Sequence, residues 1–347
     1  MGKAKKILLV LILLILLAVM AFLGMQIVGK QAMHEAEVEG VEKTALDTED
    51  IEIEDNGDVI VYKGETYRYN ENITSVLCMG VDTEELGEEG NEIGENGQAD
   101  MLMLAILDTE SGKVDLWNIS REAMTEVDIY NVDGEYVRTE EMQLCLAYAY
   151  GDGRKTSCEN TIKSVSRLLY GMPIQSYAVL NLEAIQPMND AIGGVDVVIK
   201  EGDVLPAKFK PGTTVHLEGK DVVSYVRYRS PGAEGGTLDS NNNRMARQRQ
   251  YMMNFIHKAL QQTKEDITTP INLFYIAVNG GYMVTNLTIS KISYLTSIFS
   301  KVDFSEDNFW TIPGEIVKGE KHAEYYVDDE VLYQRILDTF YIKEQTK

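Results

Sequence analysis

Five arginines are concentrated in one segment of this chain. Arg227 and Arg229 lie two residues apart, and Arg244, Arg247 and Arg249 follow after a glycine-containing loop. The whole chain carries a formal net charge of −23 at pH 7, so this group of cations contrasts with its surroundings. A guanidinium group offers a planar fork of donors that matches phosphate oxygens, and it stays charged at any working pH. The segment therefore predicts a confined phosphate or pyrophosphate site, and the acidic composition disfavours nucleic acid as a partner.

The spacing of these side chains predicts how they share one ligand. On an extended chain, the first two arginines would point to the same side. In the helix predicted over residues 244–262, Arg244 and Gln248 lie one turn apart, and Arg247 lies beside them. Two groups of donors joined by a glycine-rich loop could then close around one anion. Arg249 is interpreted as a solvated surface arginine.

Two carboxylates mark the ends of neighbouring predicted strands. Asp82 follows the strand predicted over residues 74–81, and Asp100 directly precedes the apolar run 101–107. Paired carboxylates opposite arginines suit a Mg²⁺ ion that bridges phosphate oxygens. Taken singly, each of them is equally consistent with an ordinary residue at a strand end. Arg121, at the exit of a third apolar run, is a further candidate for lining a site.

Strand and helix patterns alternate along the rest of the chain. The apolar runs 101–107 and 114–119 flank turn residues and predict a hairpin. A capping-box spacing from Thr156 to Glu159 predicts a helix that ends at Gly171. Further strands are predicted over 177–182 and 195–199, further helices over 183–191 and 328–340, and residues 221–226 fit either state. Strands interleaved with helices indicate an α/β or α+β sandwich around one sheet.

The N-terminus predicts a membrane anchor. Lys3, Lys5 and Lys6 precede an apolar run over residues 7–28, which is long enough to span a bilayer. The basic residues place residues 1–6 in the cytoplasm and the rest of the chain outside. A cleaved signal peptide with a site near residues 19–21 is the alternative, but the apolar run continues beyond that point. We therefore expect an uncleaved, single-pass anchor in the cell membrane.

One large extracellular domain is expected after the anchor. Residues 29–72 are acidic and are interpreted as a stalk with a hairpin around Lys63-Gly64, and residues 73–343 form the domain. The three cysteines do not have the spacing of a disulfide framework or a zinc site. Cys78 lies in an apolar strand pattern and is expected to be buried, whereas Cys145 and Cys158 could pair.

Several short motifs, taken in order, resemble the LytR-CpsA-Psr family of cell-wall enzymes. The resemblance covers roughly residues 73–259, with the C-terminal part completing the same domain, and the single N-terminal anchor matches as well. The motifs are GVD, GQAD before an apolar strand, ISRE, AYAYGDG, IGGVDV, YVRYRS and RMARQ. Each is weak alone, but their order is specific.

The resemblance implies a phosphotransferase on the outer face of the membrane. Such proteins move a glycopolymer from a polyprenyl-pyrophosphate carrier to peptidoglycan and form a phosphodiester. The implied fold is a three-layer α/β/α sandwich around a mixed sheet, with an apolar pocket for the prenyl chain. The candidates to line that pocket, each also consistent with ordinary core packing, are Val165, Leu168, Leu169, Ile185 and Ile192. By position, Asp82 and Asp100 match the acids on the magnesium side. The positions implied for pyrophosphate binding or catalysis are Arg121, Arg227, Arg229, Arg244, Arg247 and Gln248.

This sequence departs from the family pattern at several positions. Gln98 and Gln143 stand where many members have a cation, and Asn241 stands where many have an acid. Asp239, two residues earlier, is the candidate to replace that acid in catalysis. These changes leave open a second hypothesis, a domain that binds polyprenyl-pyrophosphate lipids without turnover in a regulatory role. Hydrolysis of the pyrophosphate, with water in place of the sugar hydroxyl, is a third.

Overall fold

The computed structural model describes residues 24–33, 41–48, 50–83, 85–86, 97–131, 133–201, 205–228, 238–302, 305–319 and 322–344. Its centre is a six-stranded sheet with the order β12-β9-β4-β5-β6-β13. β4 pairs antiparallel with β5 and parallel with β9, so the sheet is mixed. Its strands are β4 (Ile73–Val81), β5 (Ala99–Asp108), β6 (Val114–Ile119), β9 (Ser176–Asn181), β12 (Met283–Thr285) and β13 (Phe309–Thr311).

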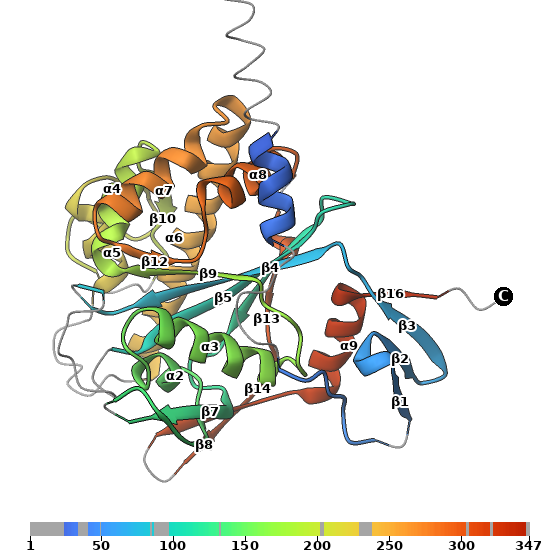
Figure 1. Cartoon of the computed structure of the whole chain (residues 1–347). Coiled ribbons are helices and arrows are strands. Elements are labelled where there is room, and N and C mark those ends of the chain that lie inside the picture. The colour runs from blue at the N-terminus through green and yellow to red at the C-terminus, as the bar shows by residue number, and fades with distance from the viewer. Residues whose placement is uncertain are drawn as a thin grey trace, which may run out of the picture.

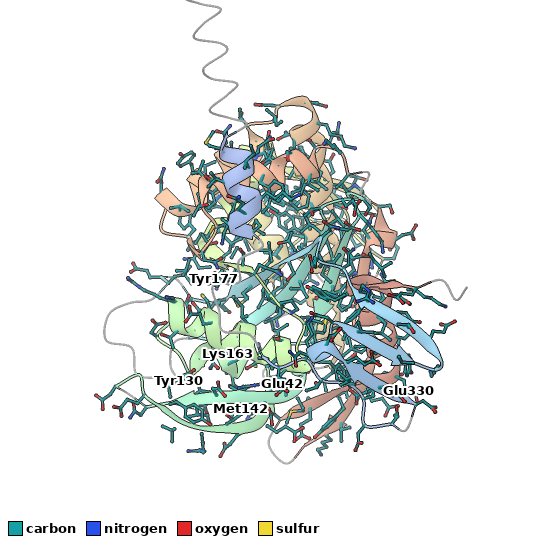
Figure 2. The ribbon with its side chains drawn as sticks, turned by 45° about the vertical axis from the view of Figure 1, so that its right-hand side comes forward. Glu42, Tyr130, Met142, Lys163, Tyr177 and Glu330 are labelled. Carbon is teal, nitrogen blue, oxygen red and sulfur yellow. The ribbon has the colours of Figure 1, made fainter. Side chains whose placement is uncertain are left out.

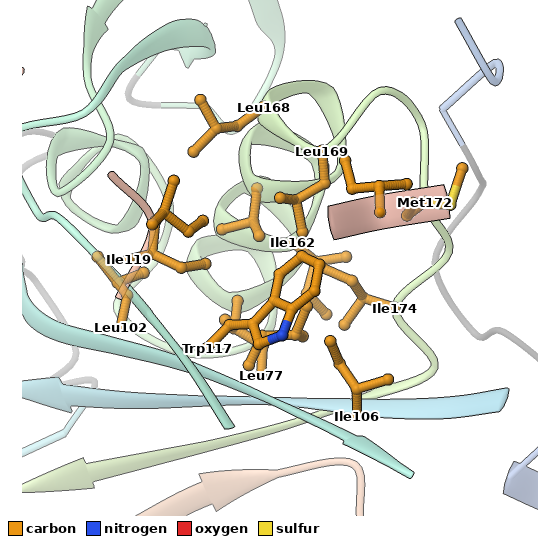
Figure 3. Close-up of a cluster of buried hydrophobic side chains, with 14 of the residues drawn as sticks. Leu77, Leu102, Ile106, Trp117, Ile119, Ile162, Leu168, Leu169, Met172 and Ile174 are labelled. Carbon is orange, nitrogen blue, oxygen red and sulfur yellow. The ribbon is translucent and has the colours of Figure 1, made fainter. Parts of the chain in front are cut away.

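Helices cover both faces of this sheet (Figures 1 and 2). The covering helices are α3 (Lys155–Leu168) and α9 (Asp329–Phe340) on one face, and α6 (Leu238–Glu265) and α8 (Ile289–Phe299) on the other. Successive residues of β4 divide between the faces: Leu77 packs in the cluster with α3 and α9, and Val76 packs in the cluster with α6 and α8. Figure 3 shows the first cluster, in which Trp117 lies among aliphatic side chains from the sheet and α3. The predicted sandwich around a mixed sheet is therefore confirmed.

A smaller unit packs beside the sheet around α6. It contains α4 (Ile185–Ala191), α5 (Lys220–Arg227) and a two-stranded sheet of β10 (Val195–Val198) and β11 (Thr214–Leu217). The segment that fitted either state is helical, because Val222, Tyr225 and Val226 have the spacing of a buried helical face. Arg227 is the last residue of this helix. The assumption that it begins an extended pair with Arg229 is therefore wrong for Arg227.

The segment interpreted as a stalk includes a folded sheet. β1 (Ile51–Glu54), β2 (Val59–Tyr62) and β3 (Glu65–Tyr69) pair in sequence, and β3 also pairs with β16 (Tyr341–Lys343) near the C-terminus. The predicted hairpin is present, and both residues of its turn have positive φ. The side chains of Ile60, Tyr62 and Tyr67 are buried in the same core cluster as α9. The sequence did not predict this packing because the partner strand lies more than 270 residues away.

The N-terminal end of α3 differs in detail from its prediction. The helix begins at Lys155, and its first turn is satisfied by the Asp152 carboxylate, which accepts hydrogen bonds from the backbone N–H groups of Arg154 (2.8 Å) and Ser157 (3.2 Å). The capping box at Thr156 is therefore wrong. The C-terminal signal is confirmed, since Gly171 has φ 80° and its N–H donates to the Ser166 carbonyl.

Two β-hairpins complete the fold at the bottom of the molecule in Figure 1. One consists of β7 (Met124–Tyr130) and β8 (Tyr136–Gln143), and the other of β14 (Gly314–Lys318) and β15 (Ala323–Val327). They meet at a bridge between Ala123 and Tyr325. The remaining helices are α2 (Leu146–Ala149) and α7 (Thr269–Asn279).

The predicted anchor lies almost wholly outside the described residues. Of the apolar run 7–28, residues 24–28 are described, and they belong to a helix over residues 24–33. Within the described part of the chain, no helix is both long and apolar enough to cross a bilayer. The anchor therefore stays a prediction.

Candidate functional site

The two candidate carboxylates lie at the same edge of the central sheet. In the antiparallel pairing of β4 and β5, Gly80 is opposite Met101 and Val81 is opposite Ala99. Asp100 is therefore the extra residue of a β-bulge, and such bulges re-aim a side chain near functional sites. Asp82 directly follows Val81. The side chains of Asp82 and Asp100 are 53% and 40% exposed, so both remain accessible to a ligand.

Arg121 lies beside Asp100, at the end of the neighbouring strand. It follows β6, whose Ile119 pairs with Leu102 of β5. Its guanidinium donates to the Asp100 carboxylate and to the side-chain oxygen of Gln98. The same group lies 3.5 Å from the Cys145 sulfur, and the Cys145 thiol donates to Gln98 at 3.7 Å. Arg121 is thus oriented by three neighbouring side chains.

Cys145 is a buried free cysteine in this cluster. Its backbone N–H donates to the Arg121 carbonyl at 3.0 Å, which fixes it beside the arginine. Burial raises the pKa of the thiol, and the positive charge of Arg121 offsets only part of that rise. The thiol is therefore neutral at neutral pH and is not an activated nucleophile. Cys158 is also free and buried, so the open possibility of a disulfide between them is not realised in this structure.

A second arginine–aspartate pair lies at the carboxyl end of β4. The guanidinium of Arg227, at the end of α5, is 3.6 Å from the Asp82 carboxylate. Both side chains are about half exposed. At that separation the contact is an ion pair in a solvated setting rather than a short hydrogen bond. It can give way when a more highly charged phosphate group arrives.

Helix α6 is attached to the end of α5 by two of the predicted site residues. Arg247 is buried, and its guanidinium donates to the carbonyls of Tyr225 (3.3 Å) and Tyr228 (2.8 Å). Gln248 donates to the carbonyl of Val226 at 3.2 Å. These bonds fix α6 against the residues that flank Arg227. They also give Arg247 a clear positioning role, whereas contact with a ligand stays a prediction for it.

The remaining predicted site residues are Arg244, Asp239 and Arg229. Arg244 is partly buried in the first half of α6. Asp239 belongs to the backbone of α6, but its side chain lies outside the described part of the structure, as does the whole of Arg229. The structure therefore brings Asp82, Asp100, Arg121 and Arg227 to one edge of the sheet, and the parts played by Arg229 and Asp239 remain predictions.

Gln98 and Gln143 have roles that the motif comparison did not predict. Gln98 accepts hydrogen bonds from Arg121 and Cys145, as described above. Gln143 donates to the carbonyl of Ala323 at 2.6 Å and so ties β8 to β15. The sequence marked both positions as departures from a pattern, but it could not name their partners because Ala323 is 180 residues from Gln143.

The donor set has the right chemistry for magnesium but is small. Within the described ranges, no group of three or more His, Cys, Asp or Glu side chains could hold a metal ion. Mg²⁺ is commonly held by one or two carboxylates together with waters and substrate phosphates. Asp82 and Asp100 supply those carboxylates from adjacent strands, so they fit an ion that arrives with a phosphorylated ligand.

The residues proposed for an apolar pocket divide between two clusters. Val165, Leu168 and Leu169 of the α3 region are buried in the cluster against the sheet. Ile185 and Ile192 pack in the separate cluster around α5 and β10. These five side chains therefore serve core packing in this structure and do not line one tunnel. An open surface pocket of about 460 Å³ lies along the second half of α6, and its lining is mostly polar, with Asn254 and Lys258 among the residues.

The comparisons with known proteins identify the class. The model of the LytR_cpsA_psr family matches residues 28–340, and this chain belongs to that family. The match includes the whole of the segment interpreted as a stalk, in agreement with the folded sheet found there.

Individual relatives are more distant. The polyisoprenyl-teichoic acid–peptidoglycan teichoic acid transferase TagU of Bacillus cereus is 29% identical over 191 residues, which are 53% of this chain and 52% of TagU. The chain thus spans about half the length of the curated relatives it matches. The crystal structure of protein gbs0355 from Streptococcus agalactiae is similar with a TM-score of 0.58 and 19% identity, over 80% of this chain and 91% of that one. TagT bound to LIIa-WTA is similar with a TM-score of 0.53 and 18% identity, over 78% and 91%. At these identities, the two structures support the fold.

Proposed function

We propose that this protein transfers a glycopolymer from a polyprenyl-pyrophosphate carrier to peptidoglycan, forming a phosphodiester bond. Membership of the family and the relatives' activity as teichoic acid transferases support the reaction class. The observation that carries the proposal is the pairing of Arg121 with Asp100 and of Arg227 with Asp82 at one edge of the sheet. Two guanidinium groups beside two carboxylates suit a pyrophosphate that arrives with a divalent cation.

The proposed reaction is a displacement at phosphorus. A sugar hydroxyl of the acceptor attacks the sugar-linked phosphorus, the bond to the bridging oxygen breaks, and prenyl phosphate leaves with the electron pair. Protein groups in such a transfer mainly position the phosphates and stabilise developing charge. Arg121 is proposed to stabilise the reacting phosphoryl group, and Arg227, Arg229, Arg244 and Gln248 to bind the pyrophosphate.

Two further roles belong to acidic residues. Asp239 is proposed to accept the proton of the attacking hydroxyl, since Asn241 cannot do so. Asp82 and Asp100 would hold Mg²⁺, which would neutralise phosphate charge when bound. Arg247 is proposed to keep α6 in place against the arginine-bearing end of α5.

The proposed location is the outer face of the cell membrane. The apolar run 7–28 would anchor the domain where its lipid-linked substrate is found, so enzyme and carrier would meet within the plane of the bilayer. Peptidoglycan would then be the second substrate on the same side.

Turnover of a short polyprenyl-pyrophosphate saccharide with a peptidoglycan acceptor tests the proposal. We expect a phosphodiester product that requires the acceptor and Mg²⁺. Tight binding without product at any Mg²⁺ concentration would favour the regulatory binder, and prenyl phosphate release without acceptor would favour hydrolysis. Either result would reject the transferase.

A further inference from the structure

The helix formed by residues 24–33, here called the N-terminal helix, has an unusual distribution of apolar side chains. Ile27 and Val28 are 63% and 55% exposed, and Met25 is 36% exposed. Met33, at the other end of the helix, is completely buried. Exposing three large apolar side chains to water within ten residues is energetically unfavourable. We therefore expect this end of the helix to lie in an apolar environment.

The same helix is built into the domain by a close backbone contact. A Cβ atom on Gly29 would lie 2.1 Å from the Ser290 carbonyl oxygen and 2.9 Å from the Tyr294 Cβ, both on α8. A helix can approach another this closely only through glycine. By contrast, a Cβ on Gly24 would meet no atom within 4 Å. Gly29 thus marks the point at which the N-terminal helix contacts α8.

Met33 fixes the other end of the helix to the central sheet. Its carbonyl accepts a hydrogen bond from the Thr74 hydroxyl of β4 at 3.3 Å, and its sulfur lies 3.7 Å from the Ser176 hydroxyl of β9. Its side chain packs with Tyr294 and Leu295 of α8. The helix is therefore a rigid part of the domain rather than a flexible tether.

The contact between Gly29 and α8 lies directly after the apolar run that is expected to span the membrane. The apolar run over residues 7–28 ends one residue before Gly29. A helix rises about 1.5 Å per residue. If the run lies in a bilayer, as proposed above, the domain surface near α8 must come within a helical turn or two of the lipid, because no linker separates them.

We infer that the N-terminal helix is a rigid connector that seats one face of the domain directly on the lipid bilayer. That face includes the exposed side of the helix and the connection between α6 and α7, where Ile267 is 47% exposed. Both views show this connection at the end of the molecule where the N-terminal helix begins (Figures 1 and 2). Glu265 and Asp266 directly precede Ile267 and are exposed, so this part of the face has no attraction for anionic lipid and the contact does not require it. This inference rests on the proposed membrane anchor and adds a fixed orientation of the domain above the membrane.

Tryptophan fluorescence with brominated lipids tests the orientation on the full chain in nanodiscs. Ile267→Trp places a probe on the proposed face, and Ile316→Trp places a matched probe on β14 at the far end of the molecule, where Ile316 is 66% exposed. The native Trp117 and Trp310 belong to the core, so the unmodified chain supplies the background. We expect severalfold stronger quenching at residue 267 than at residue 316, with or without anionic lipid. Equal quenching at the two positions, or no quenching at residue 267, would overturn the inference.

A matched pair of glycine variants tests the connector. Gly29→Leu should separate the helix from α8 and cause a clear loss of quenching at residue 267, while Gly24→Leu should leave it unchanged. Equal behaviour of these two variants would overturn the rigid connection, and the comparison of residues 267 and 316 remains valid even if Gly29→Leu does not fold. Release of the chain from nanodiscs would reject the anchor itself. Absence of glycopolymer transfer, in contrast, would reject the proposed reaction and leave the quenching result intact.

Discussion

The two arginine–aspartate pairs differ in how firmly their surroundings hold them. Arg121 contacts Asp100, Gln98 and Cys145 together, and its side chain is 34% exposed. Arg227 faces Asp82 across 3.6 Å, and its side chain is 48% exposed. Arg121 is therefore oriented before any substrate arrives, whereas Arg227 can exchange a weak surface ion pair for a phosphate. The difference suggests that Arg121 serves the transition state and Arg227 serves binding.

The largest expected effect is at Arg121. Arg121→Ala should lower kcat by about 10²–10³-fold, the usual cost of removing an oriented donor to developing charge. Arg121→Lys should rescue little, because an ammonium cannot reproduce the fork that contacts Asp100 and Gln98. Single-turnover kinetics with a polyprenyl-pyrophosphate saccharide would measure this. Arg138→Ala is a suitable control, since Arg138 pairs with Glu140 on an exposed hairpin. A change in KM alone at Arg121 would remove the distinction between the two pairs.

Asp100 should show the next largest effect. Asp100→Asn removes a charge that both orients Arg121 and is proposed to hold magnesium. Loss of a partner that merely orients a metal ligand typically costs about 10–100-fold in metal affinity, and loss of a ligand should cost at least as much. A titration of activity against Mg²⁺ should therefore shift to higher concentration, and Glu85→Gln should leave it in place. The reverse order of these two variants would contradict the proposed metal site.

A smaller effect, confined to binding, is expected at Arg227. Arg227→Ala should weaken binding of a polyprenyl pyrophosphate about 10-fold, near the lower end for a charge-assisted hydrogen bond, because the site is half exposed. Arg249→Ala should change binding little, since its guanidinium lies over the Phe309 ring, 4.5 Å from the centroid. Isothermal titration calorimetry would compare them. Similar losses for both variants would mean that general positive charge, and not this pair, accounts for binding.

Much of the sheet and its covering helices was predictable from local pattern. β4, β5 and β6 are apolar runs bounded by turn residues, and they are buried on both faces as such runs require. The part of α6 over residues 244–262 was predictable from its good helix formers and its lack of proline and glycine, whereas the first turns, rich in asparagine, were not predicted. Local patterns could not supply pairings between distant segments. β3 pairs with β16, and the backbone carbonyl that accepts the hydrogen bond from Gln143 belongs to β15, near the C-terminus.

The candidate site was predictable in its residue types but not in its contacts. Asp82, Asp100, Arg121 and Arg227 were singled out by motif and by charge. Their division into two pairs depends on the bulge at Asp100 and on α5 being helical up to Arg227. Neither feature has a local sequence signal strong enough to predict it. Sequence alone offers Cys145 only as half of a disulfide, because its contact with Arg121 depends on backbone hydrogen bonds that Cys145 makes with Arg121 and Ala99.

Arg247 differs from Arg121 and Arg227 because its main expected contribution is to the stability of the fold. It is 5% exposed and donates to two backbone carbonyls, so Arg247→Ala would leave those acceptors without their donor. We expect a loss of about 1–3 kcal/mol in the free energy of unfolding, measured by urea denaturation. Turnover at temperatures where the variant is folded should fall less than for Arg121→Ala. Unchanged stability with lost pyrophosphate binding would show instead that Arg247 contacts the ligand.

The smallest effect is expected at Cys145. A substitution there tests how much the contact with Cys145 contributes to the orientation of Arg121. Burial raises the pKa of this thiol, so between pH 6 and about 8 it stays protonated and donates to Gln98. Cys145→Ala should remove one of the groups around Arg121 and lower kcat only a few-fold, by analogy with the loss of one weak hydrogen bond. The pH profile of kcat should keep its shape, because no thiolate takes part in the reaction. A loss approaching that of Arg121→Ala, or the disappearance of a titration step, would make the thiol a reacting group and would place nucleophilic chemistry at a site now assigned to electrostatic stabilisation.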